Sequence, residues 1–232
     1  MIAFGCAVSS PEQYERLALP GIEAVRGPED ALIDVRGIDS VFRAYNEVLD
    51  RAAVLPDLEA LVVVHQDLEL ADPRIKEKIR ERFKDPSVAI LGTIGGRGVR
   101  SVGWWDCDDA FGCHELRVPR GPEGAVGPAA VMDRLLEGSD YASDFGGDGE
   151  PVDAIDGMMM VLSPWAVSTL RFDEMLGTFH GYDADFCFQA RAHGKQVMVE
   201  RMPSVHHHSA RILSSRQSWI DAHIAFARKW GL

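Results

Sequence analysis

Long apolar segments are missing from this sequence. No apolar run approaches the ~18–20 residues that a membrane-spanning helix needs, and residues 1–8 carry no basic segment ahead of an apolar stretch. A secretory signal peptide has such a basic segment. We therefore expect no signal peptide, no stable membrane anchor and a cytoplasmic location.

Cysteine and positive charge are also scarce. The four cysteines include no C-x₂-C pair, which argues against a zinc ribbon and favours reduced thiols. Cys107 and Cys113 are near enough in sequence to form a bridge, although nothing requires one. Lys and Arg number 24 against 36 Asp and Glu, a formal net charge of −12. Such an acidic chain is disfavoured as a binder of nucleic acid or of anionic lipid.

Apolar patterns in the first part of the chain alternate between the periods of strands and helices. They predict strands at 2–8, 31–35, 61–64 and 88–91, and helices at 41–52 and from Pro73 to Phe83. This alternation predicts an α/β fold with a central, mostly parallel mixed sheet flanked by helices. Internal repeats and low-complexity tracts are absent, and we expect one domain over residues 1–232.

Residues 92–128 and 138–151 differ in composition, being rich in Gly, Pro and Asp. We predict long ordered loops there, separated by a short helix at 129–136; such loops are often functional. Regular structure is then predicted to resume with a strand at 158–162, helices after Pro164 and at 184–192, and a strand at 196–200. A last helix is predicted from near Ser214, where Ser214 and Gln217 fit a capping box. Its predicted apolar face consists of Trp219, Ile220, Ile224, Ala227 and Trp230.

His65-Gln66-Asp67 directly follows the predicted strand at 61–64. In open α/β sheets, ligands bind beyond the carboxyl ends of the strands. A carboxylate in that place can hold a metal ion against phosphates. The alternative is that Asp67 only starts a turn or caps the next helix.

Two further acidic segments lie in the C-terminal half. Asp156-Gly157 precedes an apolar strand and is either a simple turn or part of a sugar-binding site. Asp183 and Asp185 stand two residues apart at a predicted helix start, where capping explains only one of the two carboxylates. The other is a candidate general base.

Histidines and tryptophans provide two more candidate clusters. If His206-His207-His208 is extended, His206 and His208 face one way and His207 the other. Histidine is a common metal ligand, and the alternative is a solvated polar loop. Trp104 and Trp105 form either a sugar-stacking platform or a core residue beside one that seals a loop.

The order of these segments resembles the GT-A glycosyltransferases of family 2, and among them the streptomycin-biosynthesis branch. The resemblance extends over most of the chain and rests mainly on ALVVVHQDLEL, VDAIDGMMMVLSP and FHGYDADFCFQARAHGK. It implies a GT-A fold. The half at about 1–100 would bind the nucleotide, and the half at about 101–232 would bind the acceptor and carry out catalysis.

The resemblance also implies roles for individual residues. Asp67 matches the last carboxylate of the family's Asp-x-Asp metal motif, and His65 stands where the first aspartate is usual. His65 is then either a softer metal ligand or a residue that supports the ligands. Asp183 matches the catalytic base of the Glu-Asp-x-Asp motif, in which Tyr182 replaces the glutamate.

Further roles follow from the same resemblance. Asp185 matches the second, more structural acidic residue of the Glu-Asp-x-Asp motif. A late histidine that can complete the metal site corresponds to His206 or His208, and the sequence does not choose between them. The residues expected to contact the donor or the acceptor are His65, Gln66, Asp156, Gly157, Asp185, Trp104 and Trp105.

The activity implied by the resemblance is an inverting transfer of sugar from a UDP-, GDP- or dTDP-sugar to an acceptor hydroxyl. Asp183 would act as the base, with Mn²⁺ or Mg²⁺ bound at Asp67. A metal ion would also give this acidic chain the local positive charge that a diphosphate needs. Two alternatives stay open: a metal-dependent hydrolase that uses the His206–His208 cluster, and a non-catalytic GT-A-like module that binds a nucleotide or sugar.

Overall fold

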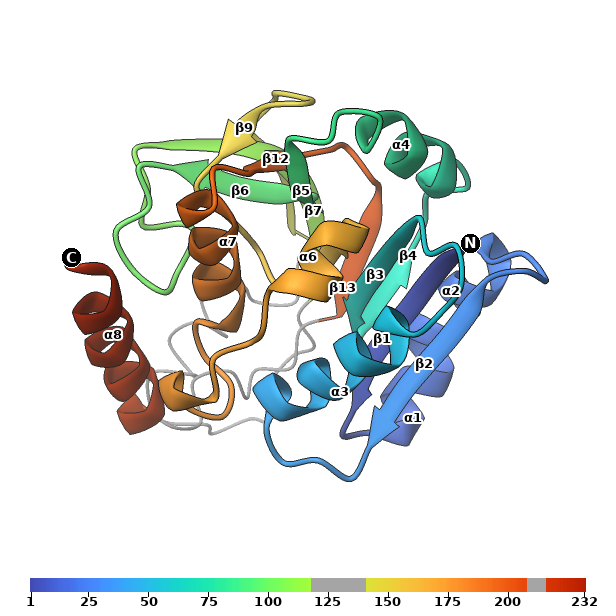
Figure 1. The fold of residues 1–232 in the computed structure, drawn as a ribbon, viewed down its shortest axis with the longest axis horizontal. Helices are drawn as coiled ribbons and strands as arrows, with labels where there is room; N and C mark the ends of the chain where they lie inside the picture. Colours follow the sequence, from blue (N-terminus) through green and yellow to red (C-terminus); the bar gives the residue numbers. More distant parts are fainter. Residues whose placement is uncertain (118–140, 208–215) are drawn as a thin grey trace.

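A seven-stranded mixed sheet forms the centre of the computed structural model, which describes residues 1–117, 141–207 and 216–232 (Figure 1). In spatial order its strands are β2 (Ala31–Arg36), β1 (Ile2–Val8), β3 (Ala60–His65), β11 (Met159–Leu162), β5 (Val88–Gly92), β12 (Gln196–Val199) and β9 (Pro151–Val152). All run in one direction except β11 and β9, which are antiparallel to their neighbours. The predicted mostly parallel mixed sheet is therefore confirmed.

Three helices, α3 (Val41–Ala53), α6 (Pro164–Thr169) and α7 (Tyr182–Ala192), pack on this sheet (Figure 1). The Ser40 and Ser163 side chains cap α3 and α6 by accepting a backbone hydrogen bond from the third helical residue. Strand β3 is covered on both faces, and none of its residues from 61 to 64 is exposed. Burial of each such side chain contributes about 1.5–3 kcal/mol. The strand is thus a firm base for the residues that follow it.

A second sheet is built largely from residues predicted to form loops. Its order is β10 (Ala154–Ile155), β6 (Ile94–Arg97), β7 (Asp109–Arg117), β13 (Ser204–His207) and β4 (Leu68–Leu70), with β8 (Tyr141–Asp144) paired to β7. The prediction of long loops over 92–128 and 138–151 was wrong where β6, β7, β8 and β9 lie. Glycine usually signals a loop, but a β-carbon on Gly95 of β6 would overlap the Ala154 carbonyl oxygen. Glycine here allows two strands to approach closely.

The other helices in the described residues are short, apart from the last. They are α1 (Pro11–Gln13), a π-helical turn (Tyr14–Ala18), α2 (Leu19–Val25), α4 (Ile75–Arg82), a 3₁₀ turn (Glu174–Leu176) and α8 (Arg216–Trp230). The helix predicted to open at Pro73 begins at Ile75. The predicted helix at 129–136 and the predicted cap at Ser214 lie outside the described residues. In the described ranges, no helix is long and apolar enough to cross a membrane.

Helix α8 covers only part of its predicted apolar face, whose two tryptophans are partly buried against the core. Ala222 and Phe226 are its buried residues, and Phe226 packs against Phe188 of α7 with ring centroids 5.1 Å apart. Ile220 and Ile224, which were predicted to be buried, are 39% and 45% exposed. The helix carries apolar residues on more than one side, and its contact with α7 decides which side is covered.

Candidate active site

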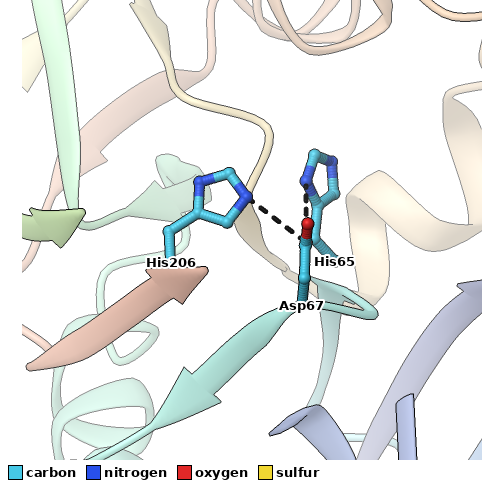
Figure 2. Close-up of side chains that lie close together, drawn as sticks. All are labelled: His65, Asp67 and His206. Carbon is cyan, nitrogen blue, oxygen red and sulfur yellow. Dashed lines mark ion pairs between the residues drawn. The ribbon is translucent and has the colours of Figure 1, made fainter. Parts of the chain in front are cut away.

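Three side chains converge beyond the carboxyl end of β3 (Figure 2). His65 is the last residue of β3, Asp67 lies in the turn before β4, and His206 belongs to β13. Strand β13 pairs with β4, and the His207 N–H donates to the Asp67 carbonyl over 2.9 Å. This pairing brings His206 Nε2 to 3.3 Å from Asp67 Oδ1, while His65 Nδ1 lies 3.9 Å from the same oxygen.

His65, Asp67 and His206, here called the His-Asp-His cluster, have the composition of a site for a divalent cation. One nitrogen or oxygen atom of each side chain lies within 4.8 Å of the other two, and the described part of the chain holds no second such group. The three side chains are mostly buried. Two imidazoles and one carboxylate suit a transition metal that takes both nitrogen and oxygen ligands better than they suit Mg²⁺.

The ionisation states in the cluster also suit metal binding. Burial raises the pKa of Asp67, but the hydrogen bond and charge of His206, together with the charge of His65, hold that pKa below its usual value. Burial lowers the pKa of His65 by more than the charge of Asp67 raises it. An ionised carboxylate and a neutral imidazole are the forms that bind metal ions.

Tyr182, the first residue of α7, connects this cluster to the next carboxylate. Its hydroxyl lies 2.5 Å from His65 Nε2, so the two ring nitrogens of His65 face different groups. The same hydroxyl touches the backbone of Gly157, where an added methyl group would overlap it. The Gly157 N–H donates to Asp183 Oδ2 over 2.8 Å. A path of three contacts, through Tyr182 and Gly157, thus joins His65 to Asp183.

Asp183 and Asp156 are nearby carboxyl groups whose pKa values are shifted in opposite directions. Burial raises the pKa of Asp183 to about 7, and the charge of Asp156 acts in the same direction. Asp156 accepts hydrogen bonds from the Met158 N–H at 2.8 Å and from the Trp104 indole at 2.7 Å. Burial raises the pKa of Asp156, but His206 and these hydrogen bonds hold it below its usual value. A carboxyl group poised near neutrality beside an ionised one can exchange a proton at neutral pH.

Comparison with known proteins identifies the family. The profile of the Glycosyltransferase like family matches residues 3–228, nearly the whole chain. The chain belongs to this family. It is also similar to streptomycin biosynthesis protein StrF of Streptomyces griseus, with 32% identity over 234 residues that cover 99% of this chain and 75% of StrF. The resemblance to family 2 glycosyltransferases is thereby confirmed.

Two solved structures share the fold at low sequence identity. GalNAc-T7, solved with UDP, GalNAc and Mn²⁺, superposes with a TM-score of 0.57 at 8% identity, covering 90% of this chain and 44% of the GalNAc-T7 chain. A197 from STIV superposes with a TM-score of 0.53 at 10% identity, covering 90% and 86%. At these identities the likeness is one of fold, and it confirms the predicted GT-A class.

The histidines that were predicted as candidate metal ligands do not all lie in the cluster. His206 lies in the cluster, as does His65, which stands where the family usually has aspartate. His207 faces elsewhere, with its Nε2 3.1 Å from Glu69 Oε2. His208 lies outside the described residues. Metal binding by any of them stays a prediction.

Asp185 bonds to residues outside the His-Asp-His cluster. Its buried carboxylate accepts hydrogen bonds from Gln189 at 2.7 Å, Lys229 at 2.9 Å and Trp230 at 2.9 Å. The last two residues belong to α8. Asp185 therefore ties α7 to the C-terminal helix, which agrees with the more structural role that the family motif implies.

Gln66 also faces away from the cluster. Its Oε1 accepts hydrogen bonds from the backbone N–H groups of Ser9 at 2.8 Å and Ser10 at 2.7 Å. Both serines follow β1, the strand next to β3. Gln66 thus fixes the chain where it leaves β1, and direct contact with a donor stays a prediction.

Trp104 and Trp105 lie in different surroundings. Trp104 is buried and bonds to Asp156, whereas Trp105 is 60% exposed and stacks on Trp219 of α8, with ring centroids 5.8 Å apart and planes inclined by 2°. Trp104 therefore belongs to the site around Asp156. Trp105 links its loop to α8. The pair therefore agrees better with the predicted alternative, in which one tryptophan lies in the core and the other seals a loop, than with a sugar-stacking platform.

His114 of β7 is a polar residue near the site that the sequence patterns did not indicate. Strand β7 pairs in parallel with β13 from Glu115 and Val205 onward, so His114 and Ser204 are the residues just before the first pair. Ser204 shares a face of β13 with His206. His114 Nδ1 and Ser204 Oγ are both buried and have no hydrogen-bond partner among the described residues. Burial lowers the pKa of His114, against the charge of Asp156. A lone histidine in a predicted loop gives no signal of such a position.

Proposed function

We propose that this chain is a metal-dependent, inverting glycosyltransferase that moves a sugar from a nucleotide-sugar donor to an acceptor hydroxyl. The observation that carries the proposal is the His-Asp-His cluster joined to Asp183 through Tyr182 and Gly157. Membership of the family supports transfer rather than hydrolysis. The presence of UDP, GalNAc and Mn²⁺ in the GalNAc-T7 structure supports a nucleotide-sugar donor and a divalent cation.

The His-Asp-His cluster would hold Mn²⁺ or Mg²⁺ through His65, Asp67 and His206. A divalent cation bound there would supply positive charge to stabilise the leaving diphosphate. The chain needs such a source, because its net charge is −12 and Asp156 and Asp183 stand nearby. The two imidazoles favour Mn²⁺ over Mg²⁺.

Asp183 is the proposed general base. Its carboxylate takes the proton of the acceptor hydroxyl while the hydroxyl oxygen forms a bond to the anomeric carbon of the donor sugar. The bond from that carbon to the diphosphate oxygen breaks, and the departing nucleoside diphosphate keeps the electron pair. Attack from the face opposite the leaving group inverts the configuration at the anomeric carbon. A pKa of about 7 for Asp183 suits a base that works near neutral pH.

Asp156 would orient a sugar beside the base. The Trp104 indole and the Met158 N–H each hold one of its carboxylate oxygens, so the group is fixed before a substrate arrives. We assign it to a hydroxyl of the donor sugar or of the acceptor. Its negative charge also helps to keep the pKa of Asp183 near neutrality.

A non-catalytic nucleotide- or sugar-binding module is the second candidate. It is favoured by His65, which replaces the first aspartate of the metal motif, and by Tyr182, which replaces the glutamate beside the base. Such a module would bind the donor and release no nucleoside diphosphate. Membership of a glycosyltransferase family, together with a buried carboxyl group beside the ionised Asp156, favours the enzyme over such a module.

Donor binding and turnover together test the proposal. Thermal unfolding is measured with UDP-, GDP- and dTDP-sugars, each with Mn²⁺ and with EDTA, because a ligand that binds only the native state raises the Tm. Release of nucleoside diphosphate is then measured with the donors that bind. We expect one nucleotide class to raise the Tm only with Mn²⁺ and to be turned over. Binding without turnover across a broad panel of acceptors would favour the binding module, and no binding at all would rule out both candidates.

A further inference from the structure

Tyr182 and His65 form a contact to which the proposed transfer step gives no chemical role. The Tyr182 hydroxyl and His65 Nε2 are 2.5 Å apart, although the residues are separated by 117 positions in the sequence. Tyr182 and His65 are also the two positions at which this chain departs from the family motifs. Their direct contact indicates that the two departures work together.

Packing holds the Tyr182 hydroxyl in place. The tyrosine ring lies 5.5 Å from the Tyr45 ring and 6.1 Å from the rings of Phe42 and Phe172, measured between centroids. The hydroxyl end rests on Gly157, where no β-carbon would fit. The position of the oxygen is therefore set by its surroundings, and the His65 ring has to match it.

The two nitrogens of His65 have different tasks. Nε2 faces Tyr182, and Nδ1 faces Asp67, 3.9 Å from Oδ1. A cation held with Asp67 would meet His65 through Nδ1, which must then carry no proton. Nε2 carries the proton in that case and needs an acceptor. Without a cation, the Asp67 carboxylate favours the proton on Nδ1, and Nε2 then needs a donor.

We propose that Tyr182 is a positioning residue that can hydrogen-bond to either tautomer of His65. The direction of the bond between its hydroxyl and His65 Nε2 reverses when the tautomer changes. The hydroxyl donates to Nε2 while Nδ1 carries the proton, and it accepts from Nε2–H when a divalent cation occupies the His-Asp-His cluster. The Nδ1 proton passes to solvent and another is taken up at Nε2, so no net proton is released. A hydroxyl can donate and accept, whereas a carboxylate only accepts and a phenyl ring does neither. This role rests on the metal site of the proposed function.

Nitrogen-15 NMR of the histidine rings shows which nitrogen carries the proton. Zn²⁺ is the probe because it is diamagnetic, and no nucleotide is present. The chain has eight histidines, so the His65 signals are identified by their loss in His65→Gln. We expect a proton on Nδ1 in the metal-free protein and on Nε2 after Zn²⁺ binds. The same tautomer before and after binding would overturn the reversal.

Tyr182→Phe keeps the packed ring and removes only the hydroxyl. Partners of a ligating histidine typically change metal affinity by roughly 10–100-fold, and we expect a loss of that size in Mn²⁺ affinity, measured by EPR without nucleotide. Tyr45→Phe is the matched control, since Tyr45 is equally buried in the same aromatic group. It should bind Mn²⁺ as the wild type does. Gly157→Ala should displace the hydroxyl and weaken binding as Tyr182→Phe does.

These outcomes separate the positioning role from the proposed function. Wild-type Mn²⁺ affinity in both Tyr182→Phe and Gly157→Ala would refute the role of Tyr182 and leave the metal site standing. A wild-type protein that binds neither Mn²⁺ nor Zn²⁺ would refute both. If Tyr182→Phe fails to fold, as judged by circular dichroism, Gly157→Ala and the wild-type NMR comparison still decide the question.

Discussion

Replacement of Asp183 by asparagine should lower turnover. It should also raise the free energy of unfolding, relative to that of the wild type, as the pH increases. The amide keeps the size of the side chain, and its oxygen can still accept one of the two backbone hydrogen bonds, from Gly157 at 2.8 Å or from Ala184 at 2.9 Å. It cannot take the proton of an acceptor hydroxyl. We expect turnover to fall by roughly 10²–10⁴-fold, with little change in the Kd for nucleotide or metal, because the base acts mainly in the transition state.

The effect on stability follows from the raised pKa. The carboxyl group of Asp183 has a pKa of about 7 in the folded chain, against about 3.9 in an unfolded one. Between these values the folded state binds more protons, so this group's contribution to stability is full below about pH 4 and is lost as the pH rises through 7. From pH 5 to pH 8 the wild type should lose about 3 kcal/mol through this group, at 1.36 kcal/mol per pH unit up to the folded pKa. Asp183→Asn lacks that loss.

Urea unfolding at pH 5 and at pH 8 measures the difference. The free energy of unfolding of Asp183→Asn minus that of the wild type should rise by about 3 kcal/mol between the two pH values. Other titrating groups cancel in this comparison. Asp50→Asn is the control, because the Asp50 side chain is 62% exposed, and it should show no such rise. A constant difference would refute the raised pKa, and wild-type turnover in Asp183→Asn would refute the base assignment.

Further substitutions test the neighbouring groups. Asp156→Asn removes a charge that raises the pKa of Asp183, so the acid limb of the pH–rate profile should move to lower pH; an unmoved limb would show that this charge does not act on the base. Asp185→Asn weakens the bonds to α8 and should lower the free energy of unfolding by about 2–4 kcal/mol, while turnover per folded molecule persists. Lost turnover at unchanged stability would instead indicate that Asp185 is the base. His206→Ala should weaken Mn²⁺-dependent nucleotide binding and His207→Ala should not, since His207 pairs with Glu69; equal effects in calorimetry would refute this distinction.

Parts of the fold and site were predictable where burial imposes a regular pattern. The continuous apolar run of residues 61–64 marks a strand covered on both faces, and the structure bears this out. Because ligands gather beyond the carboxyl ends of such strands, Asp67 was a reasonable candidate from position alone. Period-two alternation separated His206 from His207. The same pattern gave no means of choosing between His206 and His208.

Other features depend on contacts that local patterns do not encode. The bond between Tyr182 and His65 joins residues 117 positions apart, and neither segment signals the other. Strand β6 was missed because Gly95 is needed for a close approach to β10 rather than for a turn. The buried face of α8 is set by its contact with Phe188 of α7. These three contacts form only when the elements pack together, so the sequence of each segment alone does not indicate them.

Calorimetric titration of UDP tests the proposed metal-dependent donor site most directly. UDP is titrated into the wild type and into Asp67→Ala, each with Mn²⁺ and with EDTA, and GDP and dTDP are titrated in the same way to cover the other donor classes. We predict that one nucleotide binds the wild type more tightly with Mn²⁺ than with EDTA, and that Asp67→Ala loses this difference because its site lacks the carboxylate shared by His65 and His206. Equal affinity with Mn²⁺ and EDTA for all three nucleotides, or an unchanged Mn²⁺ effect in Asp67→Ala, would contradict the proposal.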